Sequence, residues 1–213
     1  MKTKKTLLII TTLVCLLPML IAAFVYQDLP AQIATHWGAD GTPNGYSSKA
    51  FACFGLPAIM AALNIFVNIL LDNDPKRKNV NNRILMVSKW CIPVVSLVAS
   101  TLTIAFALGY KVSISRITPV MVGVLLIALG NYLPKCKQNY TVGIKLPWTL
   151  NSEENWNRTH HLSGYLFILA GIVMTITAFI PNAAFLTLPF ILIAAIIPMI
   201  YSFVLFKKRD LIE

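Results

Sequence analysis

The fold is decided by residues 159–206, which read THHLSGYLFILAGIVMTITAFIPNAAFLTLPFILIAAIIPMIYSFVLF. These 48 residues contain no Asp, Glu, Lys or Arg, and a helix needs about 20 apolar residues to cross a bilayer. The run is therefore long enough for two membrane-spanning helices. Pro181-Asn182 is a turn signal, so the sequence predicts antiparallel helices over about 162–181 and 184–206 with a tight joint between them.

The rest of the chain repeats this pattern. Runs without a charged residue cover 6–27, 50–71, 90–110 and 117–134, and each is long enough for one span. Over all 213 residues, 57% are apolar and 12% charged, against about 45–50% and about 25% in soluble domains. We therefore expect an all-α membrane protein, a polytopic bundle of six transmembrane helices. Little chain remains outside the spans, which excludes a soluble enzyme, a nucleic-acid-binding module and a large ectodomain.

The basic residues predict how the chain is oriented. The predicted loops alternate between the two sides of the membrane, and one side carries 15 Lys and Arg residues whereas the other carries Lys49, Lys111 and Arg116. The positive-inside rule then places both termini in the cytoplasm. The net charge of +10 thus serves as a topology signal, and we expect the basic residues to contact membrane lipids. We expect no direct contact with nucleic acid.

We expect three parts along the chain. Residues 1–71 form an N-terminal two-helix unit with an extracytoplasmic loop at 27–49. Residues 72–116 contain a cytoplasmic basic loop and the third helix. Residues 117–213 hold the last three helices and a cytoplasmic loop at 134–161.

The 27–49 loop is predicted to be a small hairpin lying on the membrane. Residues 33–37 are able to form an extended strand, and turn signals follow them. Trp37 and Tyr46 would lie at the headgroup level. His36 and Asp40 permit three interpretations: a hydrogen-bonded turn, a loop that contacts a ligand, or a metal or acid-base pair. The last is the weakest, because no second His lies on this side.

The 134–161 loop is predicted to end in a helix. Asn151 with Glu154 resembles a capping box, and a helix from Ser152 would continue directly into the fifth span. Trp148 and Trp156 are expected to anchor the loop against the inner leaflet. The candidate interpretations are a solvated interfacial helix, a docking surface for a cytoplasmic protein and a catalytic or metal cluster. We disfavour the cluster because the adjacent residues His160 and His161 point about 100° apart on a helix.

Polar groups inside the spans are few. Asn64 and Asn68 are four residues apart and share one helix face, which indicates hydrogen bonds between helices or a polar binding face. No ionisable residue lies in the middle of a span, which argues against a proton-coupled transporter. A small-solute or lipid-handling permease is the alternative function. We expect no enzyme activity, no cofactor and no metal.

Together the two loops resemble the SdpI-type immunity protein family, whose members protect bacilli from the sporulation-delaying peptide toxin. The outer loop, from Leu29-Pro30 to Thr35-His36-Trp37, Gly41 and Lys49, resembles the N-terminal domain of unknown function that is common in that family. The inner segment resembles the family signature at Asn139, Gly143-Ile144-Lys145, Pro147-Trp148-Thr149-Leu150, Trp156 and Thr159-His160. The family signature is expected to carry arginine where this chain has Lys145, and lysine lacks the bidentate fork of arginine.

The resemblance implies an immunity or resistance protein of the bacterial cell membrane. Its partner would be a peptide toxin and, in one branch of the family, also a cytoplasmic transcriptional repressor that is recruited to the membrane. The loop residues expected to face the toxin are His36, Trp37, Asp40 and Tyr46. The residues expected to form the cytoplasmic motif are Asn139, Gly143, Lys145, Pro147, Trp148, Thr149, Trp156 and His160.

Overall fold

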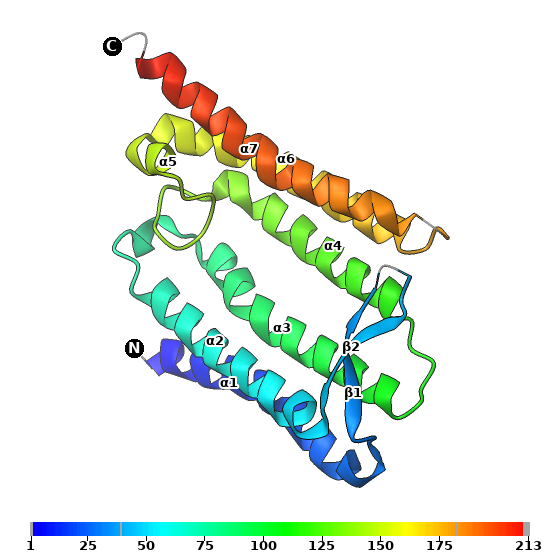
Figure 1. The fold of residues 1–213 in the computed structure, drawn as a ribbon. Helices are drawn as coiled ribbons and strands as arrows, with labels where there is room; N and C mark the ends of the chain where they lie inside the picture. The colour runs from blue at the N-terminus through cyan, green and yellow to red at the C-terminus, as the bar shows by residue number, and fades with distance from the viewer. Residues whose placement is uncertain (1, 39, 182, 211–213) are drawn as a thin grey trace. The chain divides into compact units, whose positions relative to one another are not determined.

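The computed structural model describes residues 2–38, 40–181 and 183–210, and its helices and strands are shown in Figure 1. Six helices are long and apolar enough to cross a membrane, which confirms the predicted six-helix bundle. The chain divides into two compact units. The first comprises residues 1–69 and 88–118, and the second comprises residues 70–87 and 119–213.

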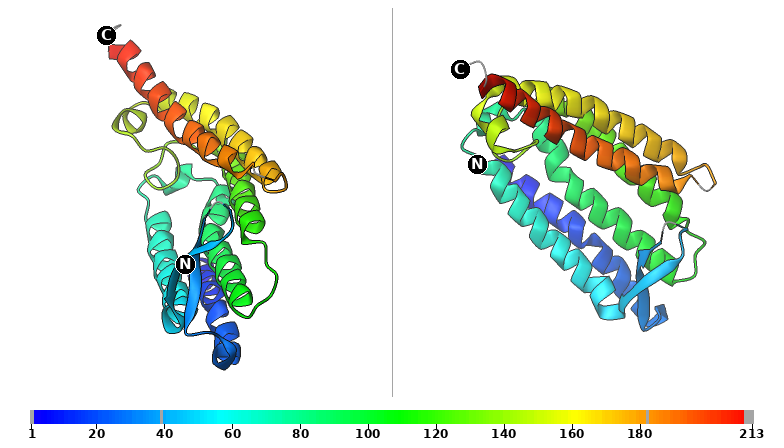
Figure 2. Two further views of the ribbon diagram at one scale, coloured as in Figure 1. Left: turned by 45° about the vertical axis from the view of Figure 1, so that its right-hand side comes forward. Right: turned by 45° about the horizontal axis from the view of Figure 1, so that its top comes forward.

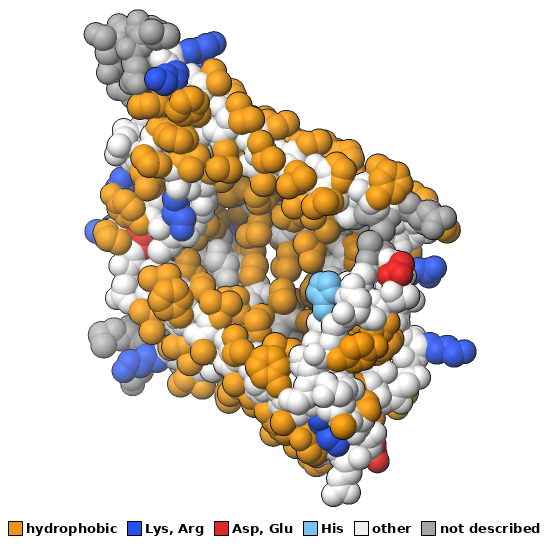
Figure 3. Space-filling view, viewed as in Figure 1, with side chains coloured by type: hydrophobic (Ala, Val, Ile, Leu, Met, Phe, Trp, Pro, Cys, Tyr) orange, Lys and Arg blue, Asp and Glu red, His pale blue; other side chains and the backbone are white. Residues whose placement is uncertain are grey.

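The helices follow the apolar runs. The long helices are α1 (Lys2–Val25), α2 (Leu56–Asp72), α3 (Asn82–Ala107), α4 (Ile114–Tyr132), α6 (Glu153–Thr177) and α7 (Thr187–Asp210). α1 continues through Pro18, where the sequence predicts a kink or a local break. Large hydrophobic side chains stay exposed along them, as on the face drawn in Figure 3. Such all-round apolar helices are typical of a lipid environment.

In the first unit, α1 and α2 are joined by a β-hairpin, as predicted. Strand β1 (Gln32–Trp37) pairs with β2 (Pro43–Ser48) in an antiparallel two-stranded sheet. Ile33 of β1 is 1% exposed and packs in a core with Ala22, Cys53 and Ile104. A π-helical turn at Phe51–Gly55 then leads into α2. The hairpin is therefore fixed to the helices by an apolar contact.

Asn64 and Asn68 also belong to the first unit, and Asn64 joins α2 to α1. The Asn64 amide donates to the hydroxyls of Thr11 (3.1 Å) and Thr12 (3.0 Å) on α1. The Asn68 amide donates to the Asn64 side-chain oxygen (3.0 Å). Both asparagines are 1% exposed. Of the two interpretations given by the sequence, this geometry agrees with interhelical packing.

In the second unit, α4 and α6 approach closely at two pairs of glycines. A Cβ atom at Gly123 would lie 2.6 Å from the carbonyl oxygen of Gly171, and one at Gly130 would lie 2.7 Å from that of Gly164. Small residues allow such close approach of helices in membranes. The pairs run in opposite order along the two helices, so α4 and α6 are antiparallel.

α6 and α7 also pack together as antiparallel neighbours (Figure 2). The start of α6 lies beside the end of α7, because the Asn155 amide donates to the Ser202 carbonyl at 2.9 Å. Their antiparallel arrangement agrees with the prediction. Asn182, which belongs to the predicted turn between these two helices, lies outside the described residues.

Candidate functional site: two loops at helix ends

The first candidate region is the hairpin. Its register shifts between Ala34 and His36, so Thr35 forms a bulge. The Thr35 hydroxyl nevertheless contacts the hydroxyl of Ser47 on the other strand at 3.0 Å. Bulges redirect side chains and are common near binding sites. Here the bulge directly precedes His36, which is exposed.

His36 and Asp40 have separate partners. The Nδ1 atom of His36 contacts the Asn44 side-chain oxygen. The Asp40 carboxylate accepts from the Thr42 hydroxyl (2.8 Å) and backbone N–H (3.0 Å), and these bonds lower the pKa of Asp40. Among the described residues, no group of His, Cys, Asp and Glu could hold a metal ion. The geometry agrees with a hydrogen-bonded turn and leaves contact with an external ligand open.

The aromatic residues of the hairpin differ in exposure. Trp37 is half-buried, with its ring edge-to-face against Phe106 at a centroid distance of 5.7 Å. Tyr46 is 61% exposed. At the base of the hairpin, the Lys49 ammonium donates to the carbonyls of Tyr26 (2.8 Å) and Leu29 (2.9 Å). A rigid hairpin therefore presents Tyr46 and His36 outward.

The second candidate region is the 134–161 loop, which is organised around Asn139. This side chain is fully buried. Its amide donates to the carbonyls of Lys137 (2.9 Å) and Val142 (3.0 Å), and its oxygen accepts from the Thr141 N–H (2.9 Å) and Val142 N–H (2.7 Å). One asparagine thus supplies the hydrogen bonds that a regular element would otherwise provide.

The connection between α2 and α3 holds this turn from outside. The Asp74 carboxylate is 6% exposed and accepts from the Tyr140 N–H (3.0 Å) and the Thr141 hydroxyl (2.7 Å). The Lys76 ammonium donates to the side-chain oxygen of Gln138. The Gln138 amide donates in turn to the carbonyl of Leu150 at 2.7 Å. The bonds of Asp74 and Lys76 thereby join residues that lie 62 or more positions apart along the chain.

Trp156 and His160 form the buried centre of the loop. Their rings stack at a centroid distance of 4.0 Å, and they are 0% and 1% exposed. The Trp156 indole N–H donates to the Cys136 carbonyl at 2.7 Å. The expectation that Trp156 anchors the loop against the inner leaflet is wrong, because the loop itself covers this side chain and satisfies its only donor.

The tautomer of His160 follows from its partners. The backbone N–H of Ile144 donates to Nε2 at 2.9 Å. Because an amide N–H can only donate, Nε2 carries no proton. The Nδ1–H then donates to the Trp156 carbonyl at 2.7 Å. His160 is therefore neutral, and both of its ring nitrogens are used within the fold.

Gly143 is required beside this pair. Its φ is +119°, which side chains rarely adopt. A Cβ atom there would overlap Nε2 of His160 and lie 3.1 Å from the Trp156 ring. The Gly143 in the family signature is thus explained by local packing.

The loop contains a short helix that the sequence did not reveal, α5 (Pro147–Asn151). The hydroxyl of fully buried Thr149 accepts from the Leu146 N–H at 2.9 Å. Trp148 stacks on Phe206 of α7, and its indole N–H donates to the Ser202 hydroxyl at 2.9 Å. Trp148 thereby fixes α5 to α7.

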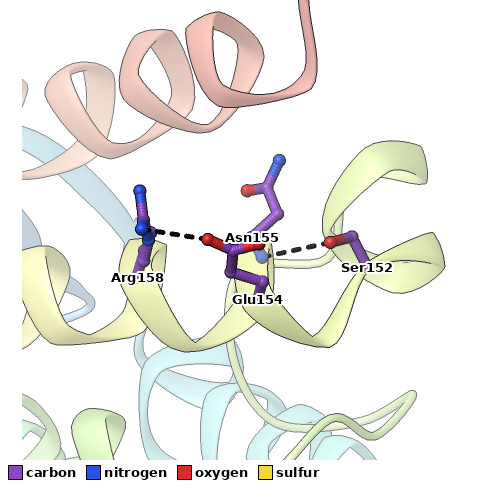
Figure 4. Close-up of polar contacts among 4 residues, drawn as sticks. All are labelled: Ser152, Glu154, Asn155 and Arg158. Atoms are coloured by element: carbon purple, nitrogen blue, oxygen red, sulfur yellow. Dashed lines mark hydrogen bonds and ion pairs between the residues drawn. The ribbon is translucent and has the colours of Figure 1, made fainter. Parts of the chain in front are cut away.

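The start of α6 differs by one residue from the predicted capping box. The N-cap is Ser152, whose hydroxyl accepts from the Asn155 N–H at 3.2 Å (Figure 4). Serine is a preferred N-cap. The carboxylates of Glu153 and Glu154 stabilise the helix, because they lie near the positive end of its dipole. The helix then runs without a break into the fifth span, as predicted.

Two motif residues remain accessible. Lys145 is exposed, and its ammonium donates to the Thr141 carbonyl at 3.0 Å. Pro147 is exposed at the first turn of α5. The other six motif residues are buried or half-buried. Sequence reasoning missed three supporting residues, Asp74, Gln138 and Ser202, because the loop groups that they support lie 11 or more positions away along the chain.

The chain is similar to proteins of known class. Residues 135–202 match the SdpI/YfhL protein family, and residues 13–61 match a domain of unknown function, DUF1648. The chain is 24% identical over 204 residues to the immunity protein SdpI of Bacillus subtilis (strain 168), covering 95% of this chain and 97% of that protein. No solved structure matches. With the six spans, these similarities make the chain a multi-pass cell membrane protein, and its C-terminal third resembles the SdpI/YfhL protein family.

Proposed function

We propose that this chain is a membrane immunity protein that protects its cell by binding a membrane-active peptide toxin. The similarity to an immunity protein along nearly the whole chain supports the class of function. Toxin binding is assigned to the hairpin loop, and the observation that carries this assignment is the outward presentation of Tyr46 and His36 on a fixed hairpin.

The chemistry of this surface suits a hydrophobic peptide. An exposed tyrosine offers a large apolar ring with one polar group, and it loses little conformational entropy on binding. His36 and Asp40 of the same hairpin are also exposed and add polar contacts. The hairpin is held by Ile33 in the core and by Lys49 at its base. Little ordering is needed before a partner binds, which favours affinity.

The orientation of the chain supports this role. The distribution of basic residues, 15 on one side against 3 on the other, predicts that the 27–49 loop lies outside the cell. A peptide arriving from outside would meet that loop first. Tyr46→Cys tests this orientation. A membrane-impermeant thiol reagent added outside the cell should label the cysteine at position 46 and should not label a cysteine introduced near either terminus.

The 134–161 loop would hold the fold and transmit occupancy. If it also recruits a repressor, the repressor has to contact accessible groups such as Lys145 and Pro147. Buried Trp156 and His160 are not available to it. Signalling requires that the toxin bind two bundle states with different affinities, since a ligand that binds both equally shifts nothing.

The permease alternative finds less support. Asn64 and Asn68 are the polar residues that a solute path through the spans would use. Their amides bond to Thr11, Thr12 and each other. Asn64 is thereby committed to packing between α1 and α2, and the Asn68 amide is bonded to Asn64 within α2.

A survival assay tests the proposed function. A toxin-sensitive bacillus expressing this chain is challenged with the sporulation-delaying peptide, beside Tyr46→Ala and His36→Ala variants matched for membrane abundance. Tyr110→Ala is the control, because Tyr110 is equally exposed (66%) and on the same predicted side but lies outside the hairpin. We expect protection by wild type and by the control, and weaker protection by the hairpin variants. Equal protection by all four would contradict the assignment to the hairpin, and none by wild type would contradict immunity to this peptide.

A further inference from the structure

A groove lies on the second unit between α6 and α7, near the start of α6. Its volume is about 460 Å³. Six residues line it: Asn157, Arg158, His161, Leu162, Tyr165 and Tyr201. Neither the buried centre of the 134–161 loop nor the hairpin shares these residues. We propose that this groove binds the headgroup of an anionic phospholipid.

The polar end of the groove carries a cation that can exchange its partner. Arg158 forms an ion pair with Glu154 one turn earlier, at 3.0 Å (Figure 4). The two side chains are 56% and 68% exposed. Exposed ion pairs of this kind are weak. A guanidinium can therefore turn to a phosphate, which it binds with two parallel hydrogen bonds.

His161 adds a second group at the same end. Its Nδ1 contacts the Asn157 carbonyl one turn back at 3.3 Å. Because a carbonyl can only accept, Nδ1 carries the proton, and Nε2 of the neutral ring is an acceptor that suits a hydroxyl of the headgroup. Arg158 and His161 are three residues apart on α6, so they are neighbours on one helix face.

The other end of the groove is apolar and aromatic. Leu162 and Tyr165 lie further along α6 from Arg158, and Tyr165 is 70% exposed. Seven residues separate Arg158 from Tyr165, which is about 10 Å along a helix axis. From Arg158 toward Tyr165 the lining thus changes from charged to apolar and aromatic, as a lipid changes from its phosphate to its acyl chains. Tyrosines are typical of this depth in a membrane.

The charge nearby favours an anionic lipid over a zwitterionic one. α7 ends with the exposed residues Lys207 and Lys208. Lys208 lies two turns beyond Tyr201 on the same helix, so both occupy one face of α7. Basic residues at a membrane surface attract anionic lipids, and basic pockets between spanning helices bind their headgroups.

The test is lipid retention by the purified full-length protein, measured by native mass spectrometry. Phosphatidylglycerol and phosphatidylcholine with identical acyl chains are titrated separately. Wild type is expected to retain phosphatidylglycerol preferentially. Arg158→Gln should reduce that retention about fivefold, the factor for about one basic contact at a membrane surface, and leave phosphatidylcholine unchanged.

Two further variants keep the test sharp. Arg83→Gln removes the same charge from an exposed arginine outside the groove, and it should leave retention unchanged. Glu154→Gln removes the competing carboxylate and should raise retention of phosphatidylglycerol. Equal losses in Arg158→Gln and Arg83→Gln would overturn the proposal, because they would show attraction by net charge alone. No preference for phosphatidylglycerol in wild type would also overturn it.

Discussion

The two loops are of similar length and differ in what they do with their polar and aromatic side chains. In the 27–49 loop, His36, Asp40 and Tyr46 are exposed. In the 134–161 loop, Trp156 and His160 are at most 1% exposed and their hydrogen bonds end on the backbone of the same chain. The first loop offers its chemistry to a partner, whereas the second uses it to fold.

This difference changes how the family signature is interpreted. The family signature lies in the 134–161 loop, where a binding site would naturally be sought. Six of its eight motif residues are instead buried or half-buried. A buried polar network has to be satisfied completely, because each unpaired group is costly. The signature thus reflects the requirements of a folded loop, and recognition is expected in the less distinctive hairpin.

Trp156→Ala should have the largest effect on stability. It removes a fully buried ring and the bond to Cys136, so we expect a loss of about 3–5 kcal/mol in the free energy of unfolding. Tyr46→Ala should change it by less than about 0.5 kcal/mol, as for other surface substitutions. Urea unfolding in detergent micelles, followed by circular dichroism, measures both. Similar losses in the two variants would break the comparison between the loops.

Gly143→Ala should be nearly as harmful, although it adds only a methyl group. The positive φ is strained for alanine, and the new Cβ overlaps His160, which together should cost about 2–3 kcal/mol. Gly109→Ala is the matched control. Its φ is +85° but the space around it is open, so it carries the strain alone. Thermal unfolding that ranks the two variants equally would show that the His160 contact is unimportant.

Asp74→Asn tests the link from the α2–α3 connection to the loop. Asp74 accepts bonds from Tyr140, Thr141 and the Lys76 N–H. Replacing the carboxylate should cost about 1.5–3 kcal/mol, the range for hydrogen bonds to charged groups. Asp28→Asn, at an exposed site, should be neutral. Limited proteolysis should then cleave the 134–142 segment faster in Asp74→Asn only.

The sequence predicts the parts of this protein that depend on local patterns. Charge-free runs locate the six spans, and the turn signals around Gly41 locate the hairpin. The one-residue error at Ser152 arises because Asn151 and Ser152 are both good N-caps. The roles of Asp74 and Ser202 could not be predicted, because nothing near them in the sequence indicates a partner 67 or 54 residues away. For the same reason the sequence predicts Trp156 against the inner leaflet, whereas its indole N–H bonds to Cys136, 20 residues away.

Asn64→Leu examines packing inside the membrane. The substitution removes the bonds to Thr11 and Thr12, and we expect a loss of about 0.6–1.7 kcal/mol, as for other hydrogen bonds between spanning helices. A double-mutant cycle with Thr12→Val isolates the interaction. Additive losses would show that the bond contributes nothing. Unchanged stability with lost protection would instead assign Asn64 to a binding face.

The smallest effect should come from the Cys136 thiol, which lies in the buried loop. Burial is the main cause that raises its pKa above the ordinary value of 9.0; the Asp74 carboxylate also raises it, and the Asn139 amide opposes the shift. The unfolded chain therefore loses this proton at a lower pH than the folded protein. Between the two pKa values the folded state holds more protons, so stability falls as pH rises through about 9 and is unaffected below that range. Urea unfolding at pH 7.5 and 9.5 should show a steeper decline for wild type than for Cys136→Ala, and Asp74→Asn should reduce the difference because it removes one cause of the raised pKa. An equal decline in wild type and Cys136→Ala would mean that solvent reaches the thiol, and the 134–161 loop would then be more open than its hydrogen bonds indicate.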